Sequence, residues 1–130
     1  MDNKPRVTII MPVYKTEQYI EETIQSVLKQ SYQNIELLCI NDDTPDGAFE
    51  ICKEYQKNYP WIRLIENSKN QGLEFTRNHG LDEMTGDYVL FLDSDDTISG
   101  DMLERMVDVA MEEDSDVVMS AYSMVVDGKE

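Results

Sequence analysis

The run Val7-Thr8-Ile9-Ile10-Met11, which Pro12 follows, decides the fold class of this chain. Consecutive apolar and mainly β-branched residues are typical of a strand that is buried on both faces, as in parallel sheets. Similar runs recur at 35–40, 61–65, 88–92 and 116–126. Segments with helical apolar spacing alternate with them, at 20–28, 48–55, 73–84 and 103–111. The alternation predicts an α/β fold with a mainly parallel sheet and helices on both faces.

Polar residues mark where three of these helices begin. Thr16, Asp46 and Ser99 each precede a helical pattern, and side chains of this type accept hydrogen bonds from free backbone N–H groups at helix starts. The last helix has a predicted buried stripe: Leu103, Met106, Val107, Ala110 and Met111.

The composition excludes several classes of function. The 130 residues amount to one domain, with 11 Lys and Arg against 27 Asp and Glu, a net charge of −16. Nucleic-acid binding and docking on anionic lipid both need a basic surface, so neither is expected. An acidic chain can bind cations, or bind an anion through a bridging metal.

Several sequence features indicate a cytoplasmic protein. The first residues lack the basic and then apolar pattern of a secretion signal, and no stretch approaches the roughly 18 apolar residues of a membrane span. Cys39 and Cys52 are interpreted as buried reduced thiols. His79 is the one histidine, so a zinc site built from cysteine and histidine is not expected.

Acidic residues follow two of the predicted strands. Asn41-Asp42-Asp43 follows the second strand, and Asp93-Ser94-Asp95-Asp96 follows the fourth. Parallel strands bring their carboxyl ends to one edge of the sheet, where ligands bind in open α/β folds. Crowded carboxylates repel one another unless they share a cation, and Mg²⁺ or Mn²⁺ prefers such oxygen ligands. The alternative is that these acids only cap the helices that follow, which suits Asp46 better than Asp93.

Motifs in order along the chain resemble the glycosyltransferases of family 2. The first half of the resemblance is carried by 7–14, 26–32, 35–37 and Asn41-Asp42 with Asp46-Gly47. The second half is carried by Asn70-Gln71-Gly72, Arg77-Asn78 and the run from Gly86 to Asp96. Each motif alone is weak, and their ordered combination over nearly the whole chain is specific. The resemblance implies a GT-A fold, a three-layer Rossmann-like architecture that binds a nucleoside-diphosphate sugar.

The resemblance also implies roles for residues of a nucleotide site. The segment Pro12-Val13-Tyr14 would line the pocket for the base, and Asp42 would hydrogen-bond the base. Arg77 would lie near the pyrophosphate or the base. Asp43 and Pro45 depart from the family pattern, which has Gly and then Ser or Thr after the first acid, so the path of this loop is open.

The Asp-Ser-Asp-Asp run matches the DXD motif of the family. By resemblance, Asp93 would face the ribose and the metal, Asp95 would be the main ligand of Mn²⁺ or Mg²⁺, and Asp96 would shape the sugar site. A bound cation would also explain how an acidic chain holds an anionic diphosphate.

The implied activity is inverting, metal-dependent transfer of a sugar to an acceptor hydroxyl. The donor would be a nucleoside-diphosphate sugar, most simply a UDP-sugar, and the acceptor a glycan or a lipid-linked molecule in bacterial polysaccharide or cell-envelope synthesis. The family uses a carboxylate base to deprotonate the acceptor. That base and the acceptor half are expected after residue 130, so residues 1–130 are interpreted as the portion that binds donor and metal.

Three other classes of protein fit the sequence less well. A nucleotidyltransferase would carry a glycine-rich loop after the first strand, where this chain has Pro12-Val13-Tyr14-Lys15. A signalling receiver domain would carry an acid pair there and a lysine after the fifth strand, and both are missing. A non-catalytic nucleotide-sugar-binding module would be expected to lose Asp93 or Asp95, and both are present.

Overall fold

A four-stranded parallel sheet forms the centre of the computed structural model, which describes residues 4–112. Its strands are β1 (Val7–Val13), β2 (Ile35–Asn41), β3 (Ile62–Glu66) and β4 (Tyr88–Phe91), in the order β3-β2-β1-β4. The helices are α1 (Ile20–Leu28), α2 (Ala48–Gln56), α3 (Leu73–Glu83) and α4 (Met102–Glu112). The predicted α/β fold is confirmed, while the fifth strand predicted at 116–126 lies outside the described residues.

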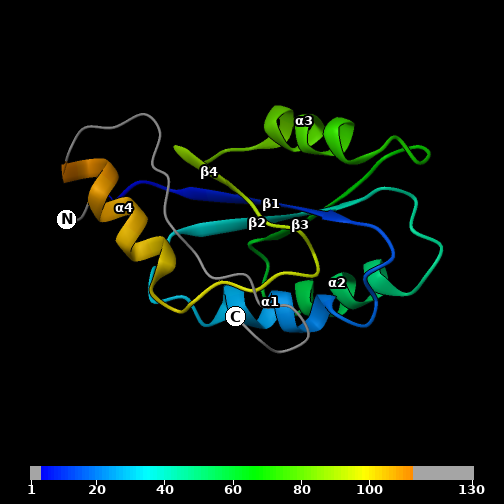
Figure 1. Ribbon diagram of the computed structural model, residues 1–130, viewed down its shortest axis with the longest axis horizontal. Helices are drawn as coiled ribbons and strands as arrows, with labels where there is room; N and C mark the ends of the chain where they lie inside the picture. The colour runs from blue at the N-terminus through cyan, green and yellow to red at the C-terminus, as the bar shows by residue number, and fades with distance from the viewer. Residues whose placement is uncertain (1–3, 113–130) are drawn as a thin grey trace.

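The sheet separates two cores, with α1 and α2 on one face and α3 on the other (Figure 1). Alternate residues of β1 point to opposite faces, so Ile9 packs toward α1 and α2 while Ile10 packs toward α3. α3 approaches the sheet closely because it has Gly80 there: a Cβ at that position would lie 2.7 Å from Ile10 Cγ2. Both cysteines are buried in the larger core, as predicted.

Pro12 does not end the first strand, although it ends the apolar run 7–11. β1 continues to Val13, and Pro12 lies opposite Ile40 of β2. The missing N–H is tolerated because that side of Pro12 faces β4, whose pairing with β1 ends at Ile10 and Phe91.

β4 is less buried than its apolar sequence predicted. Within the described residues it pairs only with β1, and the side chain of Phe91 is 42% exposed. The stripe predicted for α4 is also wrong at its end, because Met111 is exposed. The buried face of α4 runs through Leu103, Val107 and Ala110, and Met111 is turned about 100° away from Ala110 around the helix axis.

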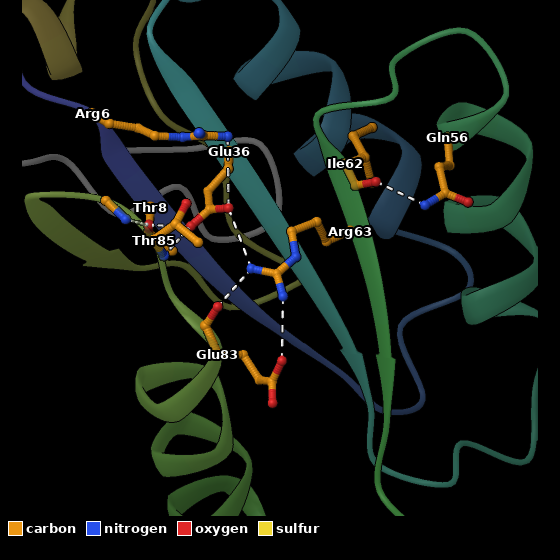
Figure 2. Close-up of polar contacts among 9 residues, drawn as sticks. Arg6, Thr8, Glu36, Gln56, Ile62, Arg63, Glu83 and Thr85 are labelled. Atoms are coloured by element: carbon orange, nitrogen blue, oxygen red, sulfur yellow. Dashed lines mark hydrogen bonds and ion pairs between the residues drawn. The ribbon is translucent and has the colours of Figure 1, made fainter.

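A buried carboxylate fixes the amino end of the sheet (Figure 2). Glu36 on β2 accepts hydrogen bonds of 2.6 Å from the Thr8 hydroxyl and the Thr85 backbone N–H, and Arg63 lies 3.4 Å from its other oxygen. Burial alone would raise the pKa of Glu36, yet the bonds from Thr8 and Thr85 and the charge of Arg6 lower it. These contacts join β1, β2 and the connection into β4.

Candidate functional site

The strand order creates a crevice between β1 and β4 at the carboxyl edge of the sheet. The chain moves from β1 outward through β2 to β3, and then returns to place β4 on the other side of β1. The helix that follows β1 covers one face of the sheet, and the helix that precedes β4 covers the other (Figure 1). Such a reversal of strand order is where α/β proteins bind ligands.

A cavity of about 330 Å³ lies at this crevice. Five of the residues predicted for the site line it: Pro12, Tyr14, Asp42, Asp93 and Asp95. Six further residues complete the lining: Thr16, Asn70, Gly72, Leu73, Thr76 and Ser94. The structure thus brings the ends of β1, β2 and β4 together with the start of α3.

Three carboxylates gather beside this cavity, and two of them, Asp93 and Asp95, belong to its lining. One ligand oxygen from each of Asp93, Asp95 and Asp96 lies within 4.8 Å of the others. Partial burial and the neighbouring charges of Asp95 and Asp93 raise the pKa of Asp96. Like charges held this close favour a shared cation, and an all-oxygen donor set suits Mg²⁺ or Mn²⁺. The donors present therefore fit a hard divalent ion.

Arg77 lies beside the acids rather than in the lining of the cavity. Its guanidinium is 3.3 Å from the Asp93 carboxylate and stacks 5.7 Å from the centre of the Phe91 ring. Its Nε is buried without a hydrogen-bond partner among residues 4–112. Because both partners are more than a third exposed, the ion pair stabilises little, but it offsets part of the local negative charge.

Asp42 is buried, and other residues of the chain hold both of its carboxylate oxygens. Oδ1 accepts from the Gln71 backbone N–H at 2.7 Å and from Asn67 Nδ2 at 2.9 Å. Oδ2 accepts from the Gly72 backbone N–H at 3.0 Å and from Asn70 Nδ2 at 3.2 Å. A carboxylate has about four acceptor positions, so all are used. Asp42 therefore organises the segment that leads into α3, a role that the sequence did not indicate.

This network continues away from the cavity to His79. Asn67 donates from Nδ2 to Asp42 and to the Thr76 hydroxyl, so its Oδ1 accepts from His79 Nδ1 at 2.7 Å. The single histidine is thus part of a hydrogen-bonded cluster behind the cavity.

Gly72 directly precedes α3 with φ of 94°, a left-handed conformation that glycine adopts without strain.

Two residues take roles that differ from those expected, and a third explains the path of the loop after β2. Val13 was expected in the base pocket, but its side chain is fully buried in the core and does not line the cavity. Thr16 does not cap α1, because its hydroxyl instead bonds the Ser94 hydroxyl at 2.7 Å across the crevice. Asp43 has φ of 57°, which explains why the loop tolerates it where the family has glycine: aspartate can adopt this conformation.

The predicted cap at α2 is present, one residue further from the helix than usual. Asp46 Oδ1 accepts from the Ala48 backbone N–H at 3.1 Å, and Gly47 intervenes. Asp46 Oδ2 accepts from the Glu17 backbone N–H at 3.0 Å. This acid therefore fastens the loop after β1 to the loop after β2, outside the cavity.

Comparison with known proteins gives one consistent result. The family model for glycosyl transferase family 2 matches residues 8–129. Glycosyltransferase GlyA of Streptococcus pneumoniae is 39% identical over 117 residues, which cover 90% of this chain and 17% of GlyA. Putative teichuronic acid biosynthesis glycosyltransferase TuaG of Bacillus subtilis is 36% identical, over 94% of this chain and 48% of TuaG. The chain thus spans less than half of either relative.

Solved structures share the fold. The 1–349 portion of S. aureus TarS, in complex with UDP-GlcNAc, superposes with a TM-score of 0.81 and 29% identity, over 85% of this chain and 32% of that portion. The mannosyltransferase PcManGT of Pyrobaculum calidifontis, in complex with GDP-Man and Mn²⁺, gives 0.68 and 26%, over 72% of this chain and 28% of that protein. The sheet and its helices are therefore those of the GT-A fold.

Proposed function

Because the chain belongs to glycosyltransferase family 2, we propose that it takes part in moving a sugar from a nucleoside-diphosphate sugar to an acceptor hydroxyl. TarS was solved with UDP-GlcNAc, and its likeness to this chain supports a UDP-linked donor. The name of TuaG, a putative teichuronic acid biosynthesis glycosyltransferase, supports a role in cell-envelope polysaccharide synthesis, where the acceptor would be a glycan or a lipid-linked molecule.

One observation carries the proposal for the donor. One oxygen from each of three carboxylates lies within 4.8 Å of the other two, and two of these residues line the cavity between β1 and β4. We assign Asp95 and Asp93 as ligands of Mn²⁺ or Mg²⁺, with Asp96 beside the sugar. The Mn²⁺ complex of PcManGT supports a metal. When bound, such an ion would offset the charge that develops on the diphosphate leaving group.

The other side of the cavity would hold the nucleoside. Pro12 and Tyr14 supply an apolar and aromatic wall there, and the exposed Tyr14 ring offers a surface on which a base can stack. Asp42 can accept a hydrogen bond from a base only by giving up one that it now accepts. The bond from Asn70 Nδ2 is the longest of the four, and Asn70 is exposed, so it is the one to exchange. Arg77 supplies a positive charge next to the acids for the diphosphate.

The acceptor and the catalytic base complete the proposal. Inversion needs one carboxylate base that deprotonates the acceptor hydroxyl. The acids beside the cavity are assigned to the metal and the sugar, so we propose that residues 1–130 form the donor- and metal-binding portion. The base and the acceptor site would then belong to a further part of the enzyme.

Thermal unfolding with UDP, in the presence and absence of Mn²⁺, tests this proposal. UDP with Mn²⁺ should raise the unfolding temperature, because a ligand that binds only the folded state stabilises it. Asp95→Asn should remove the part of this rise that depends on Mn²⁺. Asp82→Asn removes the same charge from an exposed position on α3 and should leave the rise unchanged.

Two outcomes would contradict the proposal. If Asp95→Asn keeps the full Mn²⁺-dependent rise, the assignment of the metal is wrong. If a nucleoside triphosphate is turned over and a nucleotide sugar is released as product, the chain is a nucleotidyltransferase. Release of UDP that needs an acceptor, by any enzyme containing this chain, would in turn exclude a non-catalytic sugar-binding module.

A further inference from the structure

The loop 93–99, which carries the three clustered acids, has few hydrogen bonds between its own backbone groups. Between β4 and α4, the backbone from Asp93 to Ser99 forms neither a helix nor a strand. Within the described residues, the one hydrogen bond between two backbone groups of that segment joins the Asp96 N–H to the Asp93 carbonyl, at 3.0 Å. The segment instead runs along α1 (Figure 1), and the groups that bind its backbone come from there.

Three polar side chains of the α1 region point to this loop. Thr23 and Ser26 lie on α1, and Gln30 lies two residues after its end, so the spacing of three and four places them on one side. Thr23 is fully buried and Gln30 is 2% exposed. Burial of polar groups is costly unless they form hydrogen bonds, so these side chains need partners.

Each of the three binds a backbone group of the loop or of the start of α4. The Thr23 hydroxyl donates to the Ser94 carbonyl at 3.0 Å, and Ser26 Oγ accepts from the Ile98 N–H at 3.3 Å. Gln30 uses both ends of its amide: Nε2 donates to the Ser99 carbonyl at 2.6 Å, and Oε1 accepts from the Leu103 N–H at 3.1 Å. The loop therefore takes its path from α1.

Ser94 connects the contacts from the α1 region to the acids of the loop. It is 3% exposed, lies between Asp93 and Asp95, and is held through its carbonyl by Thr23 and through its hydroxyl by Thr16. Fixing Ser94 fixes the backbone on both sides of it. Two like charges that would otherwise move apart are then kept close together, as a pre-organised cation site requires.

We propose that Thr23, Ser26 and Gln30 are positioning residues that hold the Asp93–Asp96 loop in the shape that binds a divalent cation. This inference rests on the proposed function for the identity of the ligand. The anchoring involves only residues of this chain, so it can be tested separately.

Thr23→Val tests the proposal because it keeps the shape of the side chain and removes the hydroxyl. Amide hydrogen exchange of the metal-free protein, followed by NMR, should become about tenfold faster at Asp96 and Ile98. Binding of Mn²⁺ alone, measured by electron paramagnetic resonance, should weaken about tenfold, which is the usual cost of losing a group that orients metal ligands. Thr23→Ser restores the hydroxyl and should restore both measurements.

Thr8→Val is the matched control. Thr8 is also fully buried and hydrogen-bonded, but it binds Glu36 at the opposite edge of the sheet. This variant should lower the stability of the protein and leave both the loop exchange and the Mn²⁺ affinity within twofold of wild type. If Thr23→Val does not fold, Ser26→Ala removes the acceptor of the Ile98 N–H at a half-buried position and should give the same faster exchange there.

Amide hydrogen exchange tests whether these residues position the loop, and the Mn²⁺ titration tests whether the loop binds a metal. Loop exchange within twofold of wild type in both Thr23→Val and Ser26→Ala would overturn the proposal. So would an equal effect of Thr8→Val, because the loop would then report only overall stability. If the wild type does not bind Mn²⁺ but Thr23→Val still loosens the loop, the proposed metal is wrong and the anchoring stands.

Discussion

Replacing Asp42 by Asn tests whether this residue organises the site or only lines it. The side chain keeps its size but exchanges one acceptor oxygen for an NH₂ group. In one orientation the NH₂ faces the donors Asn67 Nδ2 and the Gln71 N–H, and in the other it faces Asn70 Nδ2 and the Gly72 N–H. Two donors therefore lose their acceptor whichever way the amide turns.

The expected loss in the free energy of unfolding can be estimated from those hydrogen bonds. A hydrogen bond to a charged group contributes about 1.5–3 kcal/mol, so two lost bonds give about 3–6 kcal/mol. Water can accept the hydrogen bond from the exposed Asn70 in place of the lost oxygen. Removing the charge also removes the free-energy cost of burying it, so the net loss of stability is smaller than this sum. We expect Asp42→Asn to lower the free energy of unfolding by about 2–4 kcal/mol, with UDP binding weakened at least tenfold.

The assay is urea unfolding followed by the fluorescence of Trp61, together with titration of UDP in Mn²⁺. The control is Asp43→Asn, which makes the same change at the next residue. Asp43 is exposed, and asparagine accepts its left-handed φ of 57° readily, so less than 0.5 kcal/mol should be lost, as is usual on a surface. Equal stability of the two variants would refute the view that Asp42 organises the segment 67–72.

Two further predictions concern the scaffold beneath the site. Glu36→Gln should cost about 1.5–3 kcal/mol at pH 7, as the loss of a hydrogen bond to a charged group does, because the arginines left behind are partly exposed to water. Because the pKa of Glu36 is lower in the folded protein than its ordinary 4.5, its contribution is complete above that pH and is lost as the pH falls through the folded value. The difference between the two proteins in urea midpoint should therefore shrink at acid pH, and a constant difference would contradict this reasoning. Gly80→Ala should lose about 1–2 kcal/mol in the same assay, since overpacking against Ile10 exceeds the roughly 1 kcal/mol gained in helix propensity. Gly100→Ala, where a Cβ meets only a backbone oxygen at 3.4 Å, should be nearly neutral, and an equal loss there would contradict the packing argument.

The local sequence predicted the elements well because their causes are local. A run of β-branched apolar residues such as 7–11 favours a buried strand wherever it lies, and helical spacing of apolar residues favours a helix. The alternation of the two then limits the fold to a parallel sheet, whose carboxyl edge collects the residues after each strand. Asp42, Asp93 and Asp95 could therefore be placed near one another from the sequence alone.

Predictions from the sequence failed for side chains whose role depends on contacts with residues distant in the chain. Glu36 lies within an apolar run and gave no signal of its own, yet it is buried because Thr8, Thr85 and Arg63 satisfy it. Thr16 has the residue type of a helix cap but binds Ser94, 78 residues away. Val13 directly precedes a residue of the cavity wall, and the alternation of the strand turns it to the opposite face, into the core.

The amino-acid sequence alone predicts the order of strands and helices, the excess of negative charge and the position of acids after β2 and β4. The role of each acid is set by the packing of the folded chain. That packing encloses Asp42 among four donors and leaves Asp93, Asp95 and Asp96 together beside the cavity. Burial and hydrogen bonding depend on which segments pack against each other, and the strand order β3-β2-β1-β4 decides which segments do.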